Sequence, residues 1–238
     1  MLRQELSRSV DHDPDFEWRG TDVTRIENLS DIVFAIAFGM LIMSGDAPRT
    51  FEGLNRFLLS LVPVTFAFIM MMQIWNAHFL FFRRYALADR GVVFLNAALL
   101  LLVLVIAYPL RFIFDSLYGF ILYQFGYEDY VTDLRVNYRR ASIIMGYFTA
   151  GYALAGLLIA ALYAHALRKA EMLGLTDRER QLTRVTIWIV GMGAAWALLS
   201  CILALTTPLG AFAGFFMNAT AITSPLIRRR MKPKSRAA

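Results

Sequence analysis

The feature that most constrains this chain is the recurrence of apolar blocks about as long as a lipid bilayer is thick. A helix needs roughly 20 apolar residues to cross the hydrocarbon core. The 238-residue sequence is 58% hydrophobic, with a mean hydropathy of +0.52. Its apolar blocks are residues 25–45, 54–82, 91–114, 141–167, 182–205 and 209–227. The sequence therefore predicts an all-α, polytopic membrane protein with six transmembrane helices rather than a soluble domain.

Polar segments flank the predicted membrane domain, which occupies residues 24–227. Residues 1–23 have mixed charges and no apolar h-region, which predicts a mobile cytoplasmic tail rather than a signal peptide. Residues 228–238 are a basic cytoplasmic tail that we expect to bind anionic lipid. The connection at 115–138 is expected to be aromatic, acidic and interfacial. Because it is partly apolar, span counts of five or seven also stay open.

The distribution of positive charge predicts the orientation in the membrane. Of the 24 lysines and arginines, 18 lie in segments on the same side as both termini. The positive-inside rule then places both termini in the cytoplasm. We expect the chain to lie in the plasma membrane. The lysines and arginines cluster at the ends of the predicted helices, and this clustering accounts for the net charge of +6. Nucleic acid is therefore not an expected partner.

The first apolar block begins with a helix-start signal and ends with a glycine. Thr24 followed by Glu27 is a capping box, which predicts that the helix begins near Arg25. Gly45 supplies a glycine stop. A helix of about 21 residues rises about 31 Å, which matches the hydrocarbon core of a bilayer.

Helical periodicity gives this first block two different faces. An apolar stripe on one side, with Arg25 below it, comprises Leu29, Ile32, Ile36, Met40 and Met43. Ser30, Asp31 and Phe34 point to the opposite side. An aspartate inside a membrane helix is costly unless it is paired or hydrated, so Asp31 requires a polar partner.

Polar side chains of the next two blocks are candidates for that partner. They lie near the same membrane face, late in the second block and early in the third. A shared site of low dielectric would make their hydrogen bonds mutually dependent. The predicted buried polar network comprises Arg25, Ser30, Asp31, Asn76, His78 and Asn96. The alternative interpretation is a helix foot whose arginine contacts lipid phosphate and whose aspartate is solvated at the interface.

The start of the first block is similar to a known signature. The run Arg25-x-x-x-Leu29-Ser30-Asp31 resembles the Arg-x-x-x-Phe-Ser-Asp motif of a potassium-channel family, the prokaryotic relatives of the endolysosomal channel transmembrane protein 175. Leu29 stands where the family usually has phenylalanine. The following residues, 31–37, also resemble the first helix of that family. The resemblance rests on motifs for the first three blocks and on number and hydropathy for the last three.

This resemblance implies a homotetrameric channel whose pore is lined by copies of the first helix. The permeating ion would be K⁺, with other monovalent cations as candidates. Ile36 would form a hydrophobic constriction, with Met40 and Met43 above it, and such constrictions can gate by dewetting. Gly39 occupies a second-ring position where some relatives carry a Ser or Thr that adds to selectivity. The polar network would hold the pore helix in place.

Other function classes have weaker support in the sequence. A proton-linked secondary transporter would use Asp31 and His78 as a titrating pair, but such a site belongs at the bilayer midplane rather than near one face. An enzyme is disfavoured because no catalytic constellation is visible. The three histidines and single cysteine, Cys201, lack metal-ligand spacing, so no metal or cofactor is expected. A non-conducting regulatory subunit is a further alternative.

Overall fold

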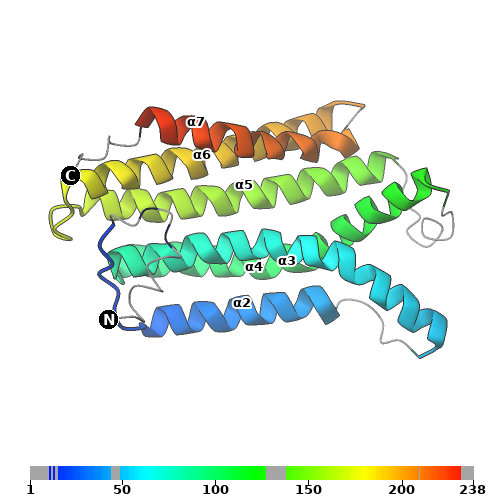
Figure 1. Ribbon diagram of the computed structural model, residues 1–238, viewed down its shortest axis with the longest axis horizontal. Helices are drawn as coiled ribbons and strands as arrows, with labels where there is room; N and C mark the ends of the chain where they lie inside the picture. Colours follow the sequence, from blue (N-terminus) through cyan, green and yellow to red (C-terminus); the bar gives the residue numbers. More distant parts are fainter. Residues whose placement is uncertain are drawn as a thin grey trace.

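The computed structural model describes residues 11, 13, 16–43, 49–126, 138–208 and 210–231. All regular structure in these residues is helical, and the helices lie side by side along one long axis (Figure 1). They are α2 (Arg25–Met43), α3 (Phe51–Tyr85), α4 (Arg90–Gln124), α5 (Tyr138–Arg168), α6 (Asp177–Thr206), the 3-10 helix η2 (Gly210–Asn218) and α7 (Ala219–Met231). Within this part of the chain, the five helices α2 to α6 are long and apolar enough to cross a membrane. The all-α, multi-pass part of the prediction is confirmed.

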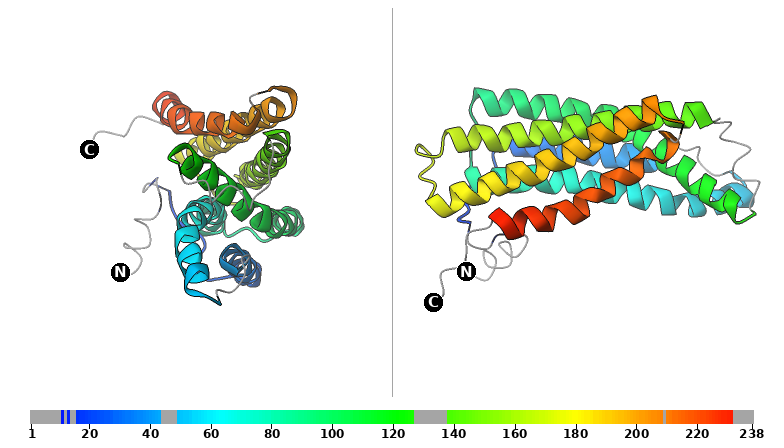
Figure 2. Two further views of the ribbon diagram at one scale, coloured as in Figure 1. Left: turned by 90° about the vertical axis from the view of Figure 1, so that its right-hand side faces the viewer. Right: turned by 90° about the horizontal axis from the view of Figure 1, so that it is seen from above.

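The predicted sixth span is not a single α-helix. It consists of η2, with 9 residues, followed directly by α7, with 13 residues. Each is shorter than the roughly 20 residues that an α-helix needs to cross a bilayer. Together they run back along α6 (Figures 1 and 2). The three arginines at 228–230 belong to the last turn of α7, and residues 232–238 of the predicted basic tail lie outside the described residues.

The third span is longer than predicted. It was expected to end near residue 114, but α4 continues to Gln124. The predicted interfacial connection is therefore partly helical, and residues 127–137 of it lie outside the described residues. Pro109 lies inside α4. Proline is tolerated within membrane helices because neighbouring groups satisfy the freed backbone carbonyl.

The start of α2 matches the prediction. The backbone N–H of Glu27 donates to the Thr24 hydroxyl at 3.3 Å, and the N–H of Thr24 donates to the Glu27 carboxylate at 2.7 Å. This reciprocal pair is the capping box that the sequence predicted. Gly45, the expected helix stop, lies outside the described residues, of which Met43 is the last in α2.

α2 lies at the edge of the bundle, where it packs against α3 and α4 (Figures 1 and 2). On the other side of these helices, α5 packs along α6 with small residues at the contacts. A Cβ added at Gly151 of α5 would lie 2.8 Å from Ile106 of α4, and one at Gly146 would lie 2.7 Å from Leu205 of α6. Such close approach suits helix association in lipid, where dispersion contacts replace the hydrophobic effect.

The described residues before α2 are packed against the bundle, which corrects the expectation of a mobile tail. Phe16 is 2% exposed, and its ring lies 5.5 Å from the ring of Tyr85 in an edge-on contact. The backbone N–H groups of Arg19 and Gly20 both donate to the carbonyl of Arg83, at 3.1 and 3.0 Å. A Cβ at Gly20 would lie 2.6 Å from the carbonyl oxygen of Phe82, so glycine permits this close approach.

Candidate functional site

The inner face of α2 is closely packed within the subunit. Ser30, Phe34, Ala37 and Leu41 recur at helical spacing and are each at most 1% exposed. They face α3 and α4, the two helices that α2 contacts. Ser30 and Phe34 lie on the side that the sequence predicted to face the protein. The position of α2 is therefore set by one face only.

The opposite face of α2 is open in the subunit. Ile36 is 53% exposed and Met43 is 81% exposed, and Leu29 and Ile32 are exposed on the same side. Gly39 and Met40 are half-buried beside this stripe. A Cβ added at Gly39 would meet no atom within 4 Å, so a larger side chain fits there without rearrangement. The residues predicted to line a pore thus lie along the uncovered side of α2.

A chain of hydrogen bonds links α2, α3 and α4 through three predicted network residues. The Asn96 side-chain amide donates to the Ser30 hydroxyl at 3.0 Å, and its carbonyl oxygen lies 2.7 Å from Nε2 of His78. The Ser30 hydroxyl also donates to the carbonyl of Ile26 at 2.7 Å. All three side chains are buried. Their partners satisfy groups that would otherwise be costly inside a membrane domain.

The other predicted members of the network lie outside this chain of hydrogen bonds. Asp31 is exposed and accepts a hydrogen bond from Nε1 of Trp75 at 3.0 Å, so its partner is an indole rather than His78. Arg25 is exposed on the same side as the apolar stripe, and Asn76 is half-buried. The structure does not bring Arg25 or Asn76 to the Ser30 cluster.

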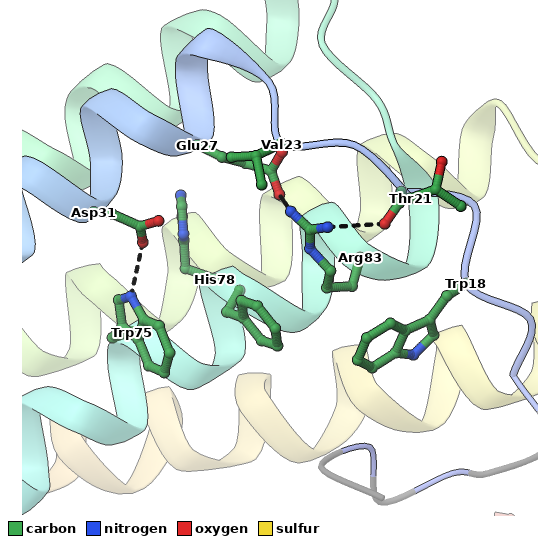
Figure 3. Close-up of a pocket in the computed structure, with 10 residues that line it drawn as sticks. Trp18, Thr21, Val23, Glu27, Asp31, Trp75, His78 and Arg83 are labelled. Carbon is green, nitrogen blue, oxygen red and sulfur yellow. Dashed lines mark hydrogen bonds and ion pairs between the residues drawn. The ribbon is translucent and has the colours of Figure 1, made fainter. Parts of the chain in front are cut away.

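An ion pair that the sequence did not predict ties the foot of α2 to the end of α3. The Arg83 guanidinium pairs with the Glu27 carboxylate, and it also donates to the carbonyl of Gly20 at 2.9 Å. Glu27 and Arg83 are both buried. The pair lines a cleft of about 340 Å³. In Figure 3 it lies between Trp18 on one side and Asp31 and Trp75 on the other. The sequence held one indication of this pair, which is the position of Glu27 in the capping box. Capping uses one oxygen of the Glu27 carboxylate and leaves the other oxygen free to pair.

Further ion pairs hold the N-terminal segment to the same end of the bundle. The Arg84 guanidinium pairs with Asp11 and, at 3.1 Å, with Asp13. Arg19 forms a two-pronged pair with Glu179 at the start of α6, with both distances 2.9 Å. Because the pairs involve Arg84 of α3 and Glu179 of α6, the segment joins the end of α3 to the start of α6. The clustered aspartates before residue 16 were visible in the sequence, but their partners were not.

A separate polar cluster joins the start of α4 to the end of α5. The Asp89 carboxylate caps α4 through the N–H of Val92 at 2.9 Å, and it binds Nε2 of His165 at 2.9 Å and Nζ of Lys169 at 2.5 Å. Partial burial raises the pKa of Asp89, but the hydrogen bonds from Lys169 and His165 outweigh it and hold the pKa below its ordinary value of 3.8. The cluster is therefore a structural ion pair at neutral pH.

The described part of the chain contains no group of three or more His, Cys, Asp or Glu side chains that would hold a metal ion. His78 is engaged by Asn96 and His165 by Asp89. The site chemistry is thus that of a packed helix with polar anchors on one side and an apolar face on the other.

Comparisons with known proteins agree on a single family. The family model described as "Endosomal/lysosomal potassium channel TMEM175" matches residues 25–107, which include α2, α3 and the first half of α4. A protein of Marivirga tractuosa named "Potassium channel" is 31% identical over 218 residues, covering 89% of this chain and 86% of the relative. The crystal structure of a variant of the potassium channel MtTMEM175, in complex with a nanobody–MBP fusion protein, superimposes with a TM-score of 0.79. That match has 29% sequence identity and covers 91% of this chain and 98% of the other.

Proposed function

Because this chain belongs to the TMEM175 family of potassium channels, we propose that it forms a potassium-permeable pore lined by copies of α2. The family and the relatives are channels rather than enzymes. Nothing in the comparisons supports the proton-linked transporter. The geometry does not favour it either, since His78 binds Asn96 and Asp31 binds Trp75.

The observation that carries this proposal is the open apolar face of α2. A single bundle of this size cannot enclose a pore, whereas several copies can surround one with their uncovered helices. Ile36 and Met43 are the exposed members of the stripe in the upper half of α2. An exposed apolar stripe on a membrane helix faces either lipid or another subunit, and membership of a channel family favours another subunit for α2. We assign this surface to a homotetramer in which four α2 helices face the central axis.

Within this pore, Ile36 forms the constriction and Met40 and Met43 form wider rings above it. Ile36 lies 11 residues after Arg25, which corresponds to about 16 Å along the helix and places it near the middle of the membrane. Four branched side chains at one level make a narrow apolar passage that can gate by dewetting. Gly39 lies between these rings and adds no side chain to the passage.

The proposed topology has six crossings and both termini in the cytoplasm. η2 and α7 in tandem supply the sixth crossing, because 9 residues at about 2.0 Å and 13 at about 1.5 Å together rise about 37 Å. The ion-paired N-terminal segment and the basic end of α7 then lie at the inner face of the plasma membrane. Arginines in the last turn of α7 are placed to contact anionic lipid headgroups.

Cation flux through purified protein in liposomes tests the channel and its constriction. We expect passive K⁺ flux in the absence of a proton gradient, and an altered flux from Ile36→Asn because four amides hydrate the constriction. Ile69→Asn is the matched control, since Ile69 is 49% exposed on α3 and follows Phe68, whose ring lies 4.5 Å from that of Phe38. It therefore introduces the same polar group at a similar depth.

The outcomes separate the competing functions. K⁺ flux that Ile36→Asn changes and Ile69→Asn leaves unchanged supports the assigned constriction. Flux that depends on a proton gradient, or no flux from a protein verified as a tetramer, refutes the channel. Equal effects of both variants would refute the placement of the constriction at Ile36 while leaving conduction intact.

The open space beside Gly39 provides a second test of the pore lining. A Cβ at this position meets no neighbouring atom in the subunit, so Gly39→Ser adds a hydroxyl without displacing α3 or α4. We expect a higher ratio of K⁺ to Na⁺ permeability from four such hydroxyls. The reversal potential under bi-ionic conditions measures this ratio, and an unchanged value would remove Gly39 from the selectivity-determining positions.

A further inference from the structure

Arg111 is a buried arginine in the middle of the apolar helix α4, and no described function accounts for it. It is 7% exposed, and it follows Pro109 by two residues. A charged side chain inside a membrane domain is costly unless protein groups satisfy it, and such residues usually serve a function. The contacts of its guanidinium therefore indicate what that function is.

The guanidinium of Arg111 binds the last turn of α2. Nη1 donates to the backbone carbonyls of Leu41 and Ile42, each at 2.8 Å. These carbonyls belong to the last described turn of α2, which runs to Met43. A hydrogen bond from an ionised donor is stronger than one between neutral groups, so the guanidinium holds these carbonyls firmly. Arg111 thus anchors this turn of α2 to the neighbouring helix α4.

The same guanidinium connects this end of α2 to two other positions. Nη2 donates to the Ser60 hydroxyl of α3 at 3.2 Å, and Nε donates to the Asp115 carboxylate of α4 at 3.1 Å. One rigid, planar group therefore joins α2, α3 and α4. Lysine cannot reproduce this pattern, because its ammonium is a single point rather than a fork of five donors.

We propose that Arg111 is a positioning residue that fixes the outer end of the pore helix and so sets the width of the outer mouth. The inference rests on the proposed function, in which α2 lines the pore. Met43 directly follows the two residues whose carbonyls Arg111 binds, and it is the most exposed residue of the stripe. Movement of the last turn of α2 therefore moves the Met43 ring, while Ile36 lies two turns away and keeps its position.

Hydrogen exchange tests this anchor without requiring conduction. We expect backbone amides of residues 40–43 to exchange about tenfold faster in Arg111→Gln than in the wild type, because the turn that Arg111 holds opens more often. Arg111→Lys retains the charge and should give a smaller increase. Arg49→Gln is the matched control, since Arg49 is an exposed arginine just before α3, on the side where α2 ends.

Single-channel recording in planar bilayers tests the effect on the pore. Arg111→Gln should change the conductance and the K⁺/Na⁺ reversal potential, whereas Arg49→Gln, which removes the same charge, should not. Equal changes in both variants would mean that Arg111 acts through charge alone, which overturns the positioning role. Where Arg111→Gln does not assemble, Arg111→Lys decides, because wild-type exchange and wild-type currents from it would also overturn the proposal.

The two measurements distinguish the failure of this inference from the failure of the channel. If the wild type conducts and Arg111→Gln has the same hydrogen exchange and the same conductance as the wild type, the positioning role is refuted and the channel is not. Faster exchange in a protein whose wild type carries no current would refute the channel, and Arg111 would then anchor an ordinary helix with no role at a pore mouth.

Discussion

Replacing Asn96 by alanine should destabilise the protein more than replacing Asn76 by alanine, although both are polar residues predicted for the same network. Asn96 is the central link between Ser30 of α2 and His78 of α3, with hydrogen bonds of 3.0 and 2.7 Å. Asn76 is half-buried and lies outside this chain of hydrogen bonds. Asn76→Ala is therefore a matched control, in which the same side chain is removed from the neighbouring helix.

The magnitude follows from what each partner loses. Ser30 keeps its bond to the carbonyl of Ile26 at 2.7 Å, so it loses only one interhelical hydrogen bond, worth about 0.6 kcal/mol on average in a membrane domain. Buried His78 is left with a ring nitrogen that has lost its partner, at a cost of about 1–3 kcal/mol. The total is about 2–4 kcal/mol. For a chain of this length, that corresponds to a fall in Tm of roughly 10 °C.

Thermal unfolding in detergent, followed by tryptophan fluorescence, measures this difference. Asn76→Ala should stay within about 2 °C of the wild type, since a change outside such a network costs about 0.5 kcal/mol. The double variant Ser30→Ala with Asn96→Ala should fall short of the sum of the two single variants, because they remove the same bond. Equal shifts for Asn76→Ala and Asn96→Ala, or full additivity, would refute the reasoning.

Two ion pairs outside this network give further predictions. Glu27→Gln should lower Tm strongly, because it leaves the buried Arg83 guanidinium without its counter-charge, at a cost of about 3–5 kcal/mol. Glu17→Gln is the control, because Glu17 is exposed and its substitution should leave Tm nearly unchanged. Equal shifts in Tm from the two variants would contradict the assigned pair. Asp89→Asn should lower Tm at pH 7 through the loss of the Lys169 pair. The pKa of Asp89 is held below 3.8, so its stabilisation is present above that pH and is lost as the pH falls through the folded-state pKa. The Tm difference between wild type and Asp89→Asn should therefore shrink below about pH 4, and a difference independent of pH would contradict the assignment.

Local signals in the sequence were sufficient to predict the five long helices α2 to α6 and three of the six residues of the polar network. The capping box at Thr24 and Glu27 placed the start of α2 correctly, because its partners are three residues apart and need no tertiary information. Ser30, His78 and Asn96 came together as predicted, because buried polar groups near one membrane face have few other partners. The broken sixth helix carried no comparable signal, since η2 and α7 share one apolar run.

Helical geometry explains why the remaining network residues are elsewhere. Asn76 precedes His78 by two positions, which is about 200° around α3, so the two side chains point to opposite sides. Arg25 belongs to the same stripe as Ile36, on the exposed side of α2, and so cannot reach the buried side. Asp31 is about 100° from Ser30 and sits at the edge of the packed face, where Trp75 reaches it. Applying the same rotation to every polar residue would have excluded Asn76 and Arg25 from the sequence alone.

The partners of the buried arginines could not have been found in this way, because they come from distant segments. Arg83 meets Glu27 across 56 positions, and Arg111 meets Leu41 across 70. Charges near span ends are usually interpreted as topology signals, and for Arg83 and Arg84 that interpretation hid their pairing. Arg111 already lay within the predicted third block, but its burial and its contact with α2 became visible only in the structure.

The arrangement of these contacts explains how a helix can be held firmly while one of its faces stays available for assembly. In lipid, the hydrophobic effect does not hold α2 against α3 and α4, because the acyl chains are equally apolar, so dispersion and polar contacts hold it instead. Polar contacts therefore fix it at both ends, through Glu27 and Ser30 at the foot and through Arg111 at the last turn. All of them lie on the packed side. If α2 lines the pore as proposed, substitutions along its open stripe should change conduction with little loss of stability. Substitutions of the anchors at the foot should instead lower stability, and Arg111→Gln should change the pore through the position of α2.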